Sequence, residues 1–168
     1  MGMSDYVRRV RAKVGNEFLL MPSVTALVFD EQRRVLLVRP SHRENVWLAP
    51  GGAVDPDEQP QDAVVREVWE ETGLVVRPSR IIGVYGGPEF VVVYPNGDET
   101  QYISCIFECE VLSGEPRAGD DEISEVRFWS RDEARALPMS PWLPPVLDRL
   151  FDPTLSGWFE PPRWHPDE

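Results

Sequence analysis

The sequence predicts an α/β domain, and three observations carry that prediction. Segments rich in β-branched and aromatic residues alternate with segments whose apolar residues recur at helical spacing. The Asn96-Gly97 pair between two strand-like segments is typical of a tight hairpin turn. A helix over 60–72 is marked at both ends, because Pro60 suits its first turn and Gly73 suits its C-cap. Strands mixed with a few helices in this way indicate an α/β unit.

The elements before this helix follow from short apolar segments and the residues that interrupt them. The expected order is a helix over 5–14, strands over 23–29 and 34–39 about a turn at 30–33, and a short strand over 47–49. Gly15 is the expected C-cap of the first helix. The short strand is expected to stop at Pro50-Gly51-Gly52.

The elements after the helix include a second marked helix start. The expected order is strands over 80–85, 90–94, 100–111 and 125–129, a helix opened by Ser130, and a last helix over 141–151. Ser130 with Glu133 three residues later is a capping box. Residues 1–151 are expected to form a single domain, and 152–168 a C-terminal tail rich in Pro and Trp.

Composition excludes some classes of function. The net charge of −12 argues against a nucleic-acid partner, because phosphate backbones are bound by clustered Lys and Arg. No apolar run approaches the roughly 20 residues that span a bilayer, and the N-terminus lacks a signal-peptide core. We therefore expect no membrane partner and a cytoplasmic location.

Cys105 and Cys109 would lie roughly 13 Å apart on one strand face, too far for a disulfide.

The helix over 60–72 gathers carboxylates on one face. At about 100° per residue, Glu67, Glu70 and Glu71 project within an arc of roughly 100°. The apolar residues lie mostly on the other side, where they are expected to pack on the sheet: Val64, Val65, Val68 and Trp69. Such carboxylates repel one another, and Mg²⁺ or Mn²⁺ would relieve the repulsion because these ions take oxygen ligands. Taken alone, such a run is commonly the solvated face of an amphipathic helix.

The stretch from Gly52 to Leu74 resembles the Nudix box, G-x5-E-x7-R-E-U-x-E-E-x-G-U, where U is apolar. Every fixed position matches: Gly52, Glu58, Arg66, Glu67, Val68, Glu70, Glu71, Gly73 and Leu74. So many specified positions make the match far more specific than a lone glycine motif. The resemblance implies a Nudix-type α/β/α sandwich with a mixed central sheet and the activity of a metal-dependent hydrolase.

The resemblance also implies roles for individual residues. Glu67, Glu70 and Glu71 would bind the divalent metal, Mg²⁺ or Mn²⁺, together with the backbone carbonyl of Gly52. Arg66 would orient the glutamates. It would do so by pairing with Glu58, unless that carboxylate touches the metal through water.

Many Nudix members use a further glutamate from a later loop as an extra ligand or base. Glu122 and Glu125 are the candidates here, and Glu122 is favoured because it precedes the strand in an acidic loop. The alternative is that Glu122 is an ordinary surface acid. The expected catalytic residues are therefore Glu70, Glu67, Arg66, Glu58 and Glu122.

Two positions before the helix depart from the usual Nudix pattern. Members often carry Glu-x-Gly-Glu where this chain has Asp55-Pro56-Asp57-Glu58. Asp57 can adopt the left-handed conformation that Gly prefers, though less readily. Gln59 replaces the usual small N-cap, which slightly weakens the start of the helix. Neither change removes an expected metal ligand.

The resemblance implies hydrolysis of a diphosphate linkage in a nucleoside diphosphate derivative, with ADP-ribose or a nucleotide sugar favoured. Arg39 and Arg43 lie where a side chain could reach a substrate phosphate, and surface charge at a strand end is the alternative. The segment over 94–102 resembles Nudix hydrolases that act on ADP-ribose or nucleotides. Aromatic residues that could stack on a base are expected mostly to pack in the sheet: Trp47, Tyr85, Phe90, Tyr94 and Tyr102.

Two other functions share this fold. A non-catalytic nucleotide-binding Nudix domain is the main alternative, and the intact carboxylates argue against it. A prenyl diphosphate isomerase would need a catalytic cysteine, and neither Cys105 nor Cys109 has a supporting motif. The expected partner is a small-molecule nucleoside diphosphate derivative. A homodimer, with the N-terminal helix and the tail over a partner subunit, stays open.

Overall fold

The computed structural model describes residues 4–41, 45–119 and 122–151. Its elements are, in chain order, α1 (Asp5–Val14), β1 (Leu19–Phe29), β2 (Val35–Pro40), β3 (Gly51–Ala53), α2 (Pro60–Thr72), β4 (Val75–Tyr85), the 3-10 helix η1 (Pro88–Phe90), β5 (Val91–Val93), β6 (Glu99–Ser113), β7 (Ile123–Trp129), α3 (Arg131–Arg135) and α4 (Leu143–Leu150). The described helices are all too short or too polar to cross a membrane.

The strands of the described residues form one mixed sheet of seven strands. Its order is β4-β6-β1-β2-β7, with β3 added to β1 and β5 added to β6. The two long central strands, β1 and β6, run parallel, and the other pairs are antiparallel. Along the edge of β1 that faces away from β6, β3 pairs with residues 23–25 and β2 pairs at Phe29. Strand β3 therefore joins the sheet at the middle of β1.

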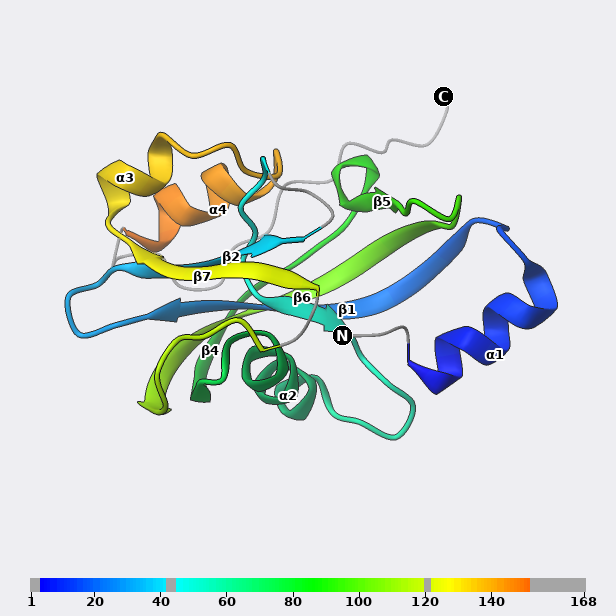
Figure 1. Cartoon of the computed structure of the whole chain (residues 1–168), viewed down its shortest axis with the longest axis horizontal. Coiled ribbons are helices and arrows are strands. Elements are labelled where there is room, and N and C mark those ends of the chain that lie inside the picture. The colour runs from blue at the N-terminus through cyan, green and yellow to red at the C-terminus, as the bar shows by residue number, and fades with distance from the viewer. Residues whose placement is uncertain (1–3, 42–44, 120–121, 152–168) are drawn as a thin grey trace, which may run out of the picture.

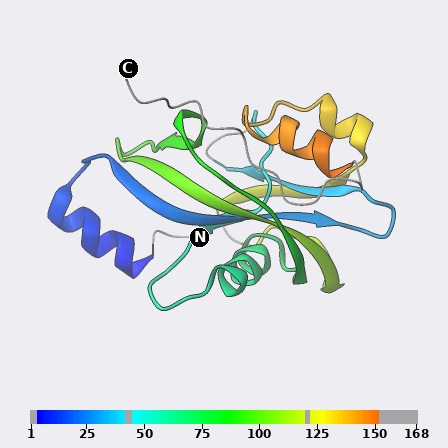
Figure 2. The same cartoon turned by 180° about the vertical axis from the view of Figure 1, so that it is seen from behind.

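Helices cover both faces of this sheet, which confirms the predicted α/β/α sandwich. Figure 1 shows α2 on one face and α3 with α4 on the other, and α1 at the far end beside the start of β1. The same layers appear from behind in Figure 2. Each face has its own apolar core: β1 sends Val24, Ala26 and Val28 toward α2, and Leu27 and Phe29 toward α4.

Several predicted local signals are confirmed. Gly15 ends α1, and its N–H donates to the Arg11 carbonyl at 2.7 Å. Gly97 lies at φ 86° in the turn between β5 and β6. The Ser130–Glu133 capping box opens α3. Both cysteines, on β6, are free thiols.

One predicted strand is wrong, and its neighbour takes its place. Within residues 47–49 only Trp47 and Leu48 form isolated bridges. The strand is instead β3, Gly51–Ala53, which begins at two of the residues predicted to stop a strand. A side chain at Gly51 would place its Cβ 2.2 Å from the Val24 carbonyl oxygen. Glycine therefore lets this segment approach β1 closely enough to pair with it.

Candidate active site

Helix α2 carries one glutamate, Glu67, on the face that packs against the sheet. Ala63, Val64 and Val68 are fully buried against the sheet, and Glu67 is buried beside them at 1% exposure. The prediction that Trp69 also packs on the sheet is wrong, since it is 55% exposed. Trp69 lies about 200° around the helix from Glu67, which turns it to solvent. The inner face of α2 is thus part apolar and part carboxylate.

The Glu67 carboxylate lies directly against the backbone of β3. A Cβ on Gly52 would stand 2.6 Å from the Glu67 carboxylate carbon and from both of its oxygens. Real Cβ atoms do not approach other atoms that closely, so Gly52 is required for this arrangement. The predicted metal ligands Gly52 and Glu67 are therefore neighbours in the structure.

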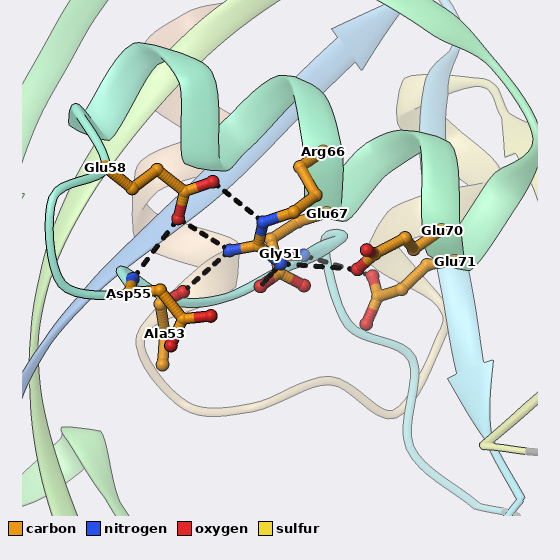
Figure 3. Close-up of polar contacts among 8 residues, drawn as sticks. All are labelled: Gly51, Ala53, Asp55, Glu58, Arg66, Glu67, Glu70 and Glu71. Atoms are coloured by element: carbon orange, nitrogen blue, oxygen red, sulfur yellow. Dashed lines mark hydrogen bonds and ion pairs between the residues drawn. The ribbon is translucent and has the colours of Figure 1, made fainter. Parts of the chain in front are cut away.

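Arg66 lies at the centre of the candidate site and joins its acidic residues (Figure 3). Its Nε and Nη2 donate to the two oxygens of Glu58, at 2.7 and 2.8 Å. Its Nη1 donates to Glu67 at 2.8 Å and to Glu70 at 3.2 Å. Nη2 also donates to the Ala53 carbonyl of β3, at 3.1 Å. One guanidinium thus connects the loop before α2, two turns of α2, and β3.

The loop before α2 holds Glu58 in place for Arg66. The backbone N–H of Asp55 donates to Glu58 Oε2 at 3.2 Å. Asp57 lies at φ 66°, the left-handed conformation expected for it. The hydrogen bond from Arg66 lowers the pKa of Glu58, against a smaller opposing effect of burial. The same bond raises the pKa of Arg66, so both partners of this pair are charged.

Glu71 faces β3 from the last turn of α2. Its Oε2 accepts the N–H of Gly51 at 3.1 Å. In Figure 3 the carboxylates of Glu70 and Glu71 lie together on the side of Arg66 away from Glu58. Glu70 is part-exposed, whereas Glu67 is not. The glutamates of α2 therefore range from a buried carboxylate at the backbone of β3 to one that reaches solvent.

The site carries more negative charge than its own cation balances. Burial is the largest influence on Glu67 and raises its pKa to about 7, although Arg66 beside it acts in the opposite direction. Across the described residues, no three His, Cys, Asp or Glu side chains stand ready to enclose a metal ion, and Arg66 holds Glu67 and Glu70. Carboxylate oxygens beside a glycine backbone are nonetheless a donor set that suits Mg²⁺ or Mn²⁺. Glu70 and Glu71 would have to turn toward Glu67 to share an ion.

The other predicted site residues lie outside this cluster or outside the described residues. Arg39, on β2, pairs with Glu125 on β7 and lies over the Trp47 ring, 5.5 Å from its centroid. Arg43 falls among residues that the structure does not describe. Glu122 is exposed, and its carbonyl accepts the N–H of Ser41 at 2.7 Å. Glu125, the less favoured of the two loop candidates, is engaged by Arg39.

Aromatic residues singled out as base-stacking candidates mostly contact one another. Phe90 stacks with Tyr85 and with Trp142, at centroid distances of 6.4 and 5.1 Å. The hydroxyls of Tyr94 and Tyr102 share a hydrogen bond of 2.7 Å. Packing within the domain therefore accounts for these side chains.

Sequence reasoning missed the backbone partners of the carboxylates. The N–H groups of Gly51 and Asp55 and the carbonyl of Ala53 each bind a site side chain. Backbone groups carry no residue-type signal, so only the paired glycines at 51 and 52 hinted at a close approach.

Comparisons with known proteins agree with this geometry. The family model of the NUDIX domain matches residues 19–150. An ADP-ribose pyrophosphatase from Methanocaldococcus jannaschii is 34% identical over 96 residues, which are 56% of this chain and 53% of that protein. A MutT-like protein from Streptomyces ambofaciens is 32% identical over 111 residues, 66% of this chain and 64% of that protein.

A solved structure agrees as well. The MutT protein from Methanosarcina mazei Go1 has a TM-score of 0.64 and 26% identity, with 80% of this chain and 95% of that chain covered. The chain spans only about half to two thirds of the two curated relatives' lengths. The matched residues include the whole sheet, α2 and the network around Arg66. The chain therefore belongs to the Nudix hydrolase family.

Proposed function

We propose that this protein hydrolyses the diphosphate linkage of a nucleoside diphosphate derivative, with a divalent metal ion as its cofactor. The observation that carries the proposal is the buried Glu67 carboxylate. It lies against Gly52, which has no side chain, and is joined by Arg66 to Glu70. A buried carboxylate is costly unless a cation balances it, and Arg66 already divides its charge among several acids.

Glu67, Glu70, Glu71 and the carbonyl of Gly52 would hold Mg²⁺ or Mn²⁺. When bound, such an ion neutralises phosphate oxygens and makes a coordinated water more acidic. Arg66 keeps the carboxylates of Glu67 and Glu70 oriented, and Glu58 orients Arg66 through a bidentate pair. Hydrogen bonds from residues behind the metal ligands, like these from Arg66 and Glu58, fix the direction of metal-binding side chains.

A proton must leave the attacking water during hydrolysis. Glu70, which reaches solvent, and the exposed Glu122 are the groups we assign to accept it. We propose that Arg39, near the end of β2, binds a substrate phosphate and that its ion pair with Glu125 breaks when it does so.

The substrate that we favour is ADP-ribose or a nucleotide sugar. The relative from Methanocaldococcus jannaschii is an ADP-ribose pyrophosphatase. The net charge of −12 disfavours long polyanionic substrates such as RNA. A small molecule with one diphosphate places little negative charge near the acidic surface.

Product formation with Mg²⁺ across ADP-ribose, nucleotide sugars, dinucleoside polyphosphates and nucleoside triphosphates tests the proposal. We expect a nucleoside monophosphate to be released from ADP-ribose or a nucleotide sugar, and the reaction to stop when a chelator is added. If a folded, metal-binding protein cleaves nothing in the panel, the nucleotide-binding alternative replaces the hydrolase.

Glu70→Gln tests the residue assignment. It removes a charge but keeps the size of the side chain, and turnover is expected to fall by about 100-fold or more. Glu115→Gln, an exposed acid in the loop after β6, is the control. A folded Glu70→Gln variant with near-normal turnover would overturn the assignment.

A homodimer and a cytoplasmic location also remain proposals. Helix α1 is fixed to the domain by the buried Arg11, whose guanidinium donates to Thr100 Oγ1 at 2.8 Å and to the Glu99 carbonyl at 2.9 Å. Tyr6 and Val14 of this helix are exposed. Light scattering during gel filtration would give the mass in solution, and a monomeric mass would end the dimer proposal.

A further inference from the structure

The sheet face that carries α2 extends beyond this helix. Helix α2 packs over the later parts of β1 and β6, where Val24, Ala26 and Phe107 are buried. Side chains two residues apart on a strand share a face. Leu20 of β1 and Ile103 of β6 therefore point the same way as these buried residues, yet they are 61% and 45% exposed. The first parts of both strands thus present apolar side chains to solvent.

The strand register joins these two side chains to their neighbours on the same face. Ile103 pairs with Pro22, and Leu20 shares its partner, Gln101, with Val91 of β5. The exposed apolar residues of β1, β4, β5 and β6 on this face define what we call the apolar patch: Leu20, Pro22, Val84, Val91, Val93 and Ile103. A continuous apolar surface to which four strands contribute is typical of a site of protein–protein interaction.

Helix α1 and the segment 54–62 lie at opposite ends of the apolar patch. The guanidinium of Arg11 binds α1 to the first two residues of β6. The N–H of Val54 donates to the Pro22 carbonyl at 3.3 Å, and the segment then leads into α2. Figures 1 and 2 both show α1 and α2 on the same side of the strands, with the first half of β1 between them.

The two ends of the apolar patch carry opposite charge. The exposed charged residues of α1 are mostly basic: Asp5, Arg8, Arg9 and Lys13. The segment 54–62 contains three aspartates and no lysine or arginine: Asp55, Asp57 and Asp62. Its one glutamate, Glu58, is already paired with Arg66. A partner that fits the apolar patch should therefore present an acidic edge to α1 and a basic edge to the segment 54–62.

We infer that the apolar patch is the interface with a second copy of this chain. A two-fold axis that crosses the strands near Ile103 packs one apolar patch on the other, so that both copies use the same surface. The same axis reverses the strand direction of the second copy, which places α1 of each copy beside the segment 54–62 of the other. A second copy therefore supplies both the acidic and the basic edge. The inference deepens the homodimer proposed above, and the reaction assigned to α2 does not enter it.

Light scattering during gel filtration, with a central residue of the apolar patch changed, tests the interface. Ile103→Lys places a charge in the middle of the contact, where its burial without a partner is costly. We expect the wild type to have twice the mass of one chain, and Ile103→Lys to weaken the dimer by at least about 100-fold. Leu112→Lys is the matched control and should leave the mass unchanged, because Leu112 is 56% exposed on the same strand but points to the opposite face.

Two results would overturn the inference. A wild type with the mass of one chain would end both the homodimer and this interface. A dimer that survives Ile103→Lys would place the contact elsewhere, and its loss on removal of residues 152–168 would assign the contact to those residues instead. Hydrolysis is assayed on the same samples, so a failure of the proposed reaction is scored separately from a failure of the interface.

A charge exchange tests the relative orientation of the two copies and covers the case in which Ile103→Lys does not fold. Arg9→Glu combined with Lys13→Glu makes α1 acidic. Gln61→Lys combined with Asp62→Lys makes the start of α2 basic. Each double variant alone brings like charges together at both ends of the interface, so its dimer should be at least about tenfold weaker than that of the wild type.

An equimolar mixture of the two double variants should restore the dimer. Both ends of the mixed dimer again pair opposite charges, so analytical ultracentrifugation should show an affinity within about threefold of the wild-type value. Each variant by itself is the control for the mixture. A mixture that associates no more tightly than the separate variants would overturn the inference.

Discussion

The Arg66 guanidinium and the Glu58 carboxylate form a bidentate pair, with N–O distances of 2.7 and 2.8 Å. The pair leaves Nη1 of Arg66 directed at Glu67 and Glu70. Glu58 therefore sets the direction of Arg66, and Arg66 sets the direction of two proposed metal ligands.

Arg66→Lys keeps the positive charge but removes the planar guanidinium, whose two N–H groups bind both oxygens of Glu58. An ammonium group cannot bind both oxygens of Glu58 in one plane while it also reaches Glu67. We expect Mn²⁺ affinity or turnover to fall by about 10- to 100-fold, the range found when residues that orient metal ligands are changed. Arg77→Lys, in an exposed pair with Glu110, is the control and should leave both unchanged. Equal losses in both variants would contradict the proposed role of Arg66.

Glu67→Gln should remove most turnover and leave the metal-free protein at least as stable as the wild type. The amide has the shape of the carboxylate, still accepts the hydrogen bond from Arg66, and costs less to bury than a charge. Urea unfolding with a chelator present measures the free energy of unfolding of both proteins. A loss of more than about 2 kcal/mol would mean that Glu67 is chiefly a structural partner of Arg66.

Gly52→Ala should reduce metal binding by displacing Glu67. The added Cβ would stand 2.6 Å from the Glu67 carboxylate, whereas the same change at Gly86 meets nothing within 3.6 Å. We expect Mn²⁺ titration, followed by electron paramagnetic resonance, to show at least about tenfold weaker binding for Gly52→Ala only. Unchanged binding would show that Glu67 and the backbone of β3 do not share an ion.

Glu108→Gln should make stability depend less on pH. Burial acts to raise the pKa of Glu108, but hydrogen bonds from Arg33 and Arg80 outweigh it and lower the pKa below its ordinary value of 4.5. The carboxylate therefore stabilises the fold above about pH 4.5, and this contribution is lost as the pH falls through its lowered pKa. The variant should be less stable by roughly 1–2 kcal/mol at pH 7 and equal to the wild type near pH 2. Urea midpoints at both pH values measure this, and a constant difference would contradict it.

Asp57→Gly should stabilise the protein slightly. Asp57 lies at φ 66°, where an L side chain costs energy and glycine does not. We expect a gain of roughly 0–1 kcal/mol in the free energy of unfolding, reduced by the greater freedom of glycine in the unfolded chain. Asp62→Gly, in the first turn of α2, is the control and should destabilise by roughly 1 kcal/mol. A destabilised Asp57→Gly would show that the aspartate makes a needed contact.

Local signals in the sequence predicted the parts of the fold that depend on neighbouring residues. Pro60 and Gly73 bound α2 at the residues expected, and Ser130 opens α3 through its capping box. Each of these signals involves contacts a few residues apart, so the amino-acid types alone are enough to reveal it. Strand ends were less well predicted: β1 begins at Leu19 rather than at residue 23, because it pairs along its length with β6.

By itself, the sequence determined that Glu67, Glu70 and Glu71 share one side of a helix, since helical geometry follows from spacing. Only the tertiary structure decided which of them is buried, because burial depends on how α2 lies against β3. The same packing left Trp69 in solvent and brought Gly119 onto the end of α2. The contacts of α2 with β3 and with Gly119 join segments far apart in the chain, and the types of the residues do not encode such distances.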